Sequence, residues 1–159
     1  MLHRHPFLAL VTGGYLAFVG WLTLSPVDSI TGATSFGIRV LDALQRRGHL
    51  TQIDHQQFEF LANVGLFVPA GMFLALLFGS RYWWVALFAC VAMTGGIEWA
   101  QQHIPGRVPD PRDLVANSLG AAVGVIVALI LMLPATLRRA RVRRARERRT
   151  GQRADPARV

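Results

Sequence analysis

The chain has 159 residues, of which 52% are hydrophobic, and it carries a formal net charge of +8. A positive mean hydropathy of +0.35 and so large a charge would conflict in a soluble domain, whereas in a membrane protein they separate into apolar spans and basic flanks. The single cysteine, Cys90, excludes an intrachain disulfide.

Four stretches are long and apolar enough to cross a bilayer, whose hydrocarbon core of roughly 30 Å requires about 20 helical residues. In chain order they are residues 7–24, 58–78, 82–102 and 114–133. The first could be a signal peptide, but it ends without a small-x-small cleavage pattern, which favours a retained helix. The sequence therefore predicts an all-α membrane protein, with residues 1–133 forming a four-transmembrane-helix bundle.

The longest connection, residues 25–57, follows the first span. Within it Ile38, Leu41 and Leu44 recur at helical spacing. This pattern is typical of a short amphipathic helix on the membrane surface, and an irregular loop is the alternative.

Polar residues from three spans are expected at one depth, near the same end of the bundle. At 1.5 Å per residue, Asn63 lies roughly 7 Å and Glu98 about 6 Å inside that end, and Asn117 lies about one turn into the fourth span. A spacing of four residues puts Glu98 and Gln102 on one helix face, and Asp113 and Asn117 on another.

The short connection between the third and fourth spans contains three prolines and two arginines, Arg107 and Arg112. We expect these arginines to pair with Glu98 and Asp113, and we expect Asp113 to cap the fourth helix or to favour its N-terminal dipole. Two interpretations stay open: a ligand or catalytic site, and a scaffold in which the polar residues only cap helices and join them.

All 17 basic residues are arginine, and ten of them follow Pro134. The positive-inside rule favours cytoplasmic termini, because Arg4, Arg81 and the ten tail arginines then lie inside, against Arg39, Arg46, Arg47, Arg107 and Arg112 outside, twelve against five. We expect the tail, residues 134–159, to contact anionic lipid headgroups and to be disordered from about residue 150. Nucleic acid is the less favoured partner, because no aromatic residues interrupt the basic run.

Two glycines four residues apart on the fourth span, Gly120 and Gly124, permit close helix contact, within the chain or in a homo-oligomer. The histidines show no metal-ligand spacing, so we expect neither a metal nor a cofactor.

Two segments together resemble the VanZ-like family. One is Asn63-Val64-Gly65-Leu66-Phe67-Val68-Pro69-Ala70-Gly71, in which Gly65 departs from the apolar residue typical of the family. The other is Ile97-Glu98-Trp99-Ala100-Gln101-Gln102, followed by Pro105-Gly106-Arg107, Asp113-Leu114-Val115-Ala116-Asn117 and Gly120-Ala121-Ala122-Val123-Gly124. The resemblance covers roughly residues 6–133.

The resemblance implies a multi-pass protein of the bacterial inner membrane. Founding members are associated with reduced sensitivity to teicoplanin, a lipidated glycopeptide that targets cell-wall precursors at the outer membrane face. The resemblance also implies a functional region, whose residues are Asn63, Glu98, Gln102, Arg107, Asp113 and Asn117.

Three classes of function are consistent with these features. The first, which we favour, is a non-catalytic envelope protein acting at the outer leaflet on or around lipid-linked cell-wall components or lipoglycopeptides. The second is a membrane-embedded enzyme that uses Glu98 or Asp113 as acid or base, with Arg107 holding a phosphate or carboxylate. The third is a small transporter or flippase subunit.

Overall fold

The computed structural model describes residues 6–25, 45–47, 54–104 and 110–154, and it is helical throughout its long elements. The expected surface helix around Ile38 to Leu44 lies outside these residues. The main helices are α1 (Pro6–Leu24), α3 (His55–Phe78), α4 (Trp83–Gln101) and α5 (Pro111–Ala154). A short 3-10 helix, η2 (Ser80–Tyr82), forms the turn between α3 and α4 after Gly79, whose positive φ of 81° suits glycine.

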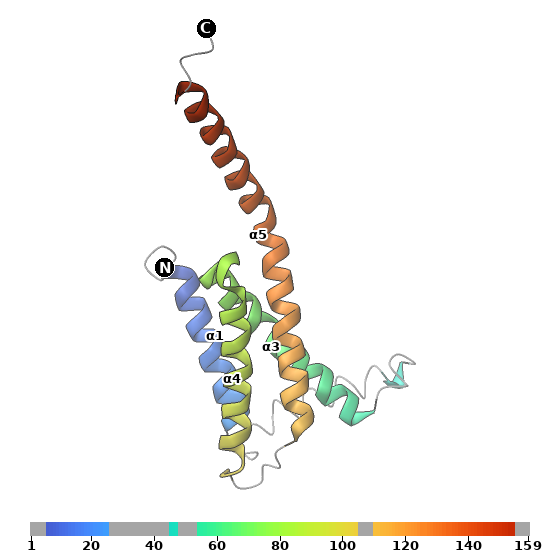
Figure 1. The fold of residues 1–159 in the computed structure, drawn as a ribbon. Helices are drawn as coiled ribbons and strands as arrows, with labels where there is room; N and C mark the ends of the chain where they lie inside the picture. Colours follow the sequence, from blue (N-terminus) through green and yellow to red (C-terminus); the bar gives the residue numbers. More distant parts are fainter. Residues whose placement is uncertain (1–5, 26–44, 48–53, 105–109, 155–159) are drawn as a thin grey trace.

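Within the described ranges, four helices are long and apolar enough to cross a membrane: Pro6–Leu24, His55–Phe78, Ser80–Gln101 and Pro111–Arg138. They include the four predicted spans almost completely. Successive helices run in opposite directions, so the beginning of α1 and the end of α5 lie toward the same end of the molecule (Figure 1). The chain is therefore an all-helical, multi-pass membrane protein.

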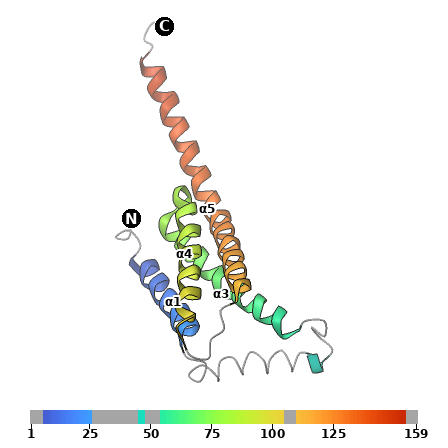
Figure 2. The same cartoon turned by 60° about the horizontal axis from the view of Figure 1, so that its bottom comes forward.

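Helix α3 crosses α5 obliquely, and these two helices contact each other more extensively than any other pair (Figures 1 and 2). Glycines make the crossing close. A Cβ atom on Gly120 would collide with the carbonyl of Val64, and one on Gly124 would collide with the carbonyl of Val68. The small-residue face of α5 is thus used for a contact within the chain, and any association between copies must leave that contact in place.

Helix α1 packs on α3 and α4, and two hydrogen bonds fix its position. The hydroxyl of Tyr15 donates to the backbone oxygen of Leu66 on α3 at 2.7 Å, and the Gln101 side-chain amide of α4 donates to the backbone oxygen of Thr23 at 3.0 Å. Because no water competes within a bilayer, such backbone carbonyls are effective partners for buried polar side chains.

Helix α5 continues beyond the apolar span. We expected the fourth span to stop at Pro134, but the helix passes through this proline and extends to Ala154. The backbone is also helical from residue 150 to 154, where disorder was expected. The arginine-rich segment therefore continues the last membrane helix and projects from the end of the bundle where α1 begins (Figure 1).

Candidate polar site at one end of the bundle

A hydrogen bond between α3 and α5 lies at the centre of the predicted polar region. The side-chain amide of Asn63 donates to a carboxylate oxygen of Asp113 at 2.6 Å, and both residues are partly buried. Their separation along the chain is 50 residues. This bond joins the N-terminal parts of the two helices on the side where α5 begins.

Asp113 can make this bond because the residue that caps α5 is Asp110. A carboxylate oxygen of Asp110 accepts the backbone N–H of Arg112 at 2.9 Å, and its backbone oxygen accepts the N–H of Asp113 at 2.9 Å. The capping role expected of Asp113 therefore belongs to Asp110. Asp113 still lies in the first turn of α5, where a negative charge is favoured by the helix dipole.

Glu98 on α4 brings a third helix to this cluster. Its carboxyl group is partly exposed and lies near enough to Asp113 and Asp110 for their charges to interact. Three carboxyl groups from the end of α4 and the start of α5 thus share one end of the bundle. Asn63 and Glu98 are thus both linked to Asp113 at this end of the bundle, whereas counting residues gave the shared depth to Asn63, Glu98 and Asn117.

Asn117 lies one turn deeper on α5 and pairs with a residue that we did not predict. Its side-chain amide donates to the hydroxyl of Thr94 on α4 at 2.8 Å, in a buried environment. Asn117 is only 4% exposed, and its side-chain oxygen has no hydrogen-bond partner among the residues that the structure describes. Thr94 precedes Glu98 by four residues, just as Asp113 precedes Asn117. The polar side chains therefore form two successive levels between α4 and α5.

The remaining predicted residues are placed differently. Gln102 is exposed at the end of α4, whereas its neighbour Gln101 is the buried glutamine that contacts α1. Arg107 lies outside the described residues. We expected Arg112 to pair with a carboxylate. Instead, its guanidinium donates to the side-chain oxygen of Gln56 on α3 at 3.0 Å, and it forms no ion pair with a carboxylate of the described part of the chain.

Sequence reasoning missed the contributions of Gln56 and Thr94. Thr94 could have been found, because it shares a helix face with Glu98 at a spacing of four residues. Gln56 could not, because it is 56 residues from its partner Arg112 and lies outside the span predicted for the second helix. Within the described ranges, no group of three or more His, Cys, Asp or Glu side chains is arranged to hold a metal ion.

Four apolar helices with a polar cluster at one end define a multi-pass helical membrane protein. The family model described as VanZ/LLP1 matches residues 12–132, which contain the two middle spans, most of the first and last spans, and the whole described cluster. The chain belongs to this family. No curated protein and no solved structure matches it.

Proposed function

We propose that this VanZ-family protein acts at the outer leaflet of a bacterial inner membrane, on or around lipid-linked cell-wall components or lipoglycopeptides. The observation that carries the proposal is the convergence of Asn63, Glu98 and Asp113 from three helices at one end of the bundle. Ionisable groups inside or at the edge of a membrane are expensive to maintain and commonly mark functional sites. The teicoplanin phenotype associated with founding family members supports this substrate class.

The proposal includes an orientation, with both termini in the cytoplasm and the polar cluster on the outer side. Arg81 lies at the turn between α3 and α4, Arg138 is the last residue of the span in α5, and Arg141 lies beyond it. All three would be cytoplasmic in this orientation, in agreement with the positive-inside rule. Fusing a fluorescent protein and, separately, alkaline phosphatase to the C-terminus tests this: fluorescence without phosphatase activity is expected, and the reverse result contradicts the orientation.

An enzyme acting on a lipid-linked substrate is the second candidate, and the proximity of Glu98 to Asp113 favours it. In this candidate Glu98 or Asp113 would act as acid or base toward the substrate. In this candidate Arg107 would hold a phosphate or carboxylate of the substrate. The enzyme candidate differs from the first proposal in requiring a chemically altered lipid product, which mass spectrometry of membrane lipids would detect.

The decisive experiment for the first proposal measures teicoplanin sensitivity in a strain lacking the gene and complemented with variants. Glu98→Gln, Asp113→Asn and Arg107→Ala should increase sensitivity at least several-fold while the protein remains at normal membrane abundance. Glu59→Gln, which changes an exposed acid near the start of α3, is the matched control and should have no effect. Unchanged sensitivity at full abundance for the three site variants would overturn the proposal, and loss of abundance would identify a structural role.

A further inference from the structure

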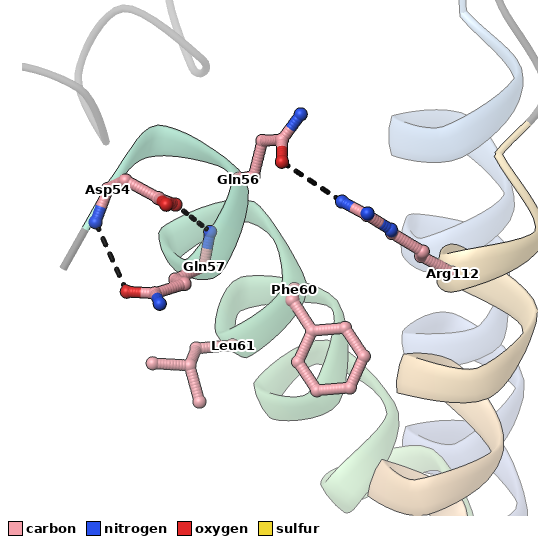
Figure 3. Close-up of a pocket in the computed structure, with 6 residues that line it drawn as sticks. All are labelled: Asp54, Gln56, Gln57, Phe60, Leu61 and Arg112. Carbon is pink, nitrogen blue, oxygen red and sulfur yellow. Dashed lines mark hydrogen bonds between the residues drawn. The ribbon is translucent and has the colours of Figure 1, made fainter.

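A groove of about 570 Å³ lies beside the polar cluster, between the first turns of α3 and the start of α5 (Figure 3). We call it the Arg112 groove. It is lined by Asp54, Gln56, Gln57, Phe60, Leu61 and Arg112. None of the five residues of the predicted functional region that the structure describes lines it. The hydrogen bond between Asn63 and Asp113 lies next to the groove and joins its two walls. Asp113 directly follows Arg112 on α5, and Asn63 follows Phe60 by three residues on α3.

The polar wall of the groove carries the positive charge of Arg112, whose side-chain partner in the described part of the chain is the neutral Gln56. The guanidinium of Arg112 donates through one nitrogen to Gln56, and it forms no ion pair with a carboxylate among the described residues. The groove's own acid, Asp54, is occupied as the cap of α3, where its carboxylate accepts the N–H of Gln57 at 2.7 Å and the Gln57 side chain accepts the N–H of Asp54. The remaining guanidinium N–H groups of Arg112 are therefore suited to an anion.

The other wall is apolar. Leu61 is 53% exposed, and the ring of Phe60 lies below the Arg112–Gln56 pair in the close-up (Figure 3). Both walls belong to the outermost turns of membrane-spanning helices, since Arg112 is the second residue of the last span and Gln56 the second residue of the span formed by α3. The groove thus changes from charged to apolar within the first two turns of the span formed by α3.

We propose that the Arg112 groove binds the phosphate of an anionic lipid, with the lipid's hydrocarbon chain lying along Phe60 and Leu61. Arginine matches the geometry of phosphate with paired N–H groups, and the anion would meet a guanidinium that forms no ion pair with a carboxylate of the described residues. The volume is sufficient for a phosphate headgroup and the first part of a chain, since small-molecule sites typically occupy about 300–1,000 Å³. A free phosphate would leave the apolar wall unused.

This inference deepens the proposed function and rests on it for the orientation, because the groove lies at the same end as Asn63, Glu98 and Asp113. A lipid-linked phosphate bound by Arg112 would have its headgroup beside that polar cluster. Substrate recognition would then involve Arg112 and Gln56, and the cluster would act on whatever the phosphate carries.

The test uses the full chain in phosphatidylcholine nanodiscs that contain a small fraction of phosphatidic acid bearing a photoactivatable diazirine on its acyl chain. Labelled peptides are identified by mass spectrometry. We expect labelling of the segment with Phe60 and Leu61, and at least a fivefold decrease of that labelling in Arg112→Gln. Labelling near the basic end of α5 should not change and is the internal control. Arg112→Lys should restore part of the groove labelling.

Arg81→Gln is the matched control, because Arg81 is also an exposed arginine at a helix end but lies at the opposite end of the bundle. Unlabelled phosphatidic acid should compete, whereas phosphatidylcholine should not. Equal labelling of Phe60 and Leu61 in the Arg112→Gln protein, or equal labelling by a diazirine phosphatidylcholine, would overturn the inference. Competition by inorganic phosphate as strong as that by the lipid would identify a phosphate site and overturn the lipid assignment.

The labelling experiment and the teicoplanin-sensitivity experiment can succeed or fail independently of each other. Specific groove labelling with unchanged teicoplanin sensitivity in the cluster variants would leave the lipid site in place and remove the proposed role. Absent labelling with a clear change of sensitivity would do the reverse.

Discussion

Asn117 donates a hydrogen bond of 2.8 Å to Thr94, while its own side-chain oxygen lies buried with no partner in the described part of the chain. This pair joins α4 to α5 below the charged level formed by Glu98 and Asp113. Interhelical hydrogen bonds within membranes contribute on average only about 0.6 kcal/mol and rarely more than 1.7 kcal/mol. The hydrogen bond of this pair therefore adds only modestly to the stability of two helices that also pack through apolar side chains.

The contribution of the Asn117–Thr94 hydrogen bond can be measured with a double-mutant cycle of Thr94→Val and Asn117→Ala. We expect a coupling energy of about 0.6 kcal/mol in the free energy of unfolding, determined by steric trapping in bicelles. Independent effects of the two substitutions would show that the hydrogen bond contributes nothing measurable in the bilayer.

The glycine crossing between α3 and α5 should be far less tolerant of substitution. Gly120→Ala or Gly124→Ala places a methyl group against a backbone carbonyl of α3, so the helices must separate. We expect each to lower the free energy of unfolding by about 1–3 kcal/mol. Gly13→Ala and Gly95→Ala are the matched controls, since a Cβ atom at either position meets no other atom within 4 Å. Similar losses for all four variants would contradict the importance of this crossing.

The Asn63–Asp113 bond predicts a specific pattern of loss and rescue. Asn63→Asp replaces the donor with a second carboxylate facing Asp113, and hydrogen bonds to charged groups are typically worth about 1.5–3 kcal/mol. We expect reduced thermal stability and membrane abundance in this variant. Adding Asp113→Asn exchanges the two groups and should recover part of the loss. A double variant as impaired as the single one would show that the side-chain contact does not determine the effect.

The two adjacent glutamines at the end of α4 should behave differently. Gln101→Leu removes the bond to the Thr23 carbonyl and should weaken the attachment of α1, at a cost of about 1 kcal/mol. Gln102→Leu changes an exposed side chain and should alter the free energy of unfolding by less than about 0.5 kcal/mol. Comparing the midpoints of denaturation of the two variants checks this, and the opposite order would contradict the structural assignment.

Much of this fold can be predicted from the sequence, because a bilayer imposes a minimum length on apolar helices and restricts charges to their ends. The depth at which Asn63 and Glu98 converge also follows from counting residues, since the rise per residue is fixed. The predicted end of the fourth helix was wrong, because we expected Pro134 to terminate it. A proline removes one backbone donor but does not forbid the helix from continuing on both sides.

The individual partners could not be predicted with the same success. Which of Gln101 and Gln102 faces α1 depends on the rotation of α4 about its axis, and a nearly uniform apolar helix carries little information on that rotation. Likewise, Arg112 could have reached several carboxyl groups, and only the oblique crossing of α3 over α5 places Gln56 within its reach. Interhelical geometry, set by glycine contacts, decides these pairings.

The order in which the helices are synthesised gives the α3–α5 contact a further consequence. Helix α3 packs most extensively on α5, yet α5 emerges last, after the turn at Gly79 and the whole of α4. The face of α3 that contacts Gly120 and Gly124 must therefore be covered by lipid or by insertion machinery until the last span has been inserted. Both walls of the Arg112 groove come together only at that moment, so completion of the last helix and assembly of the groove are the same event in biogenesis.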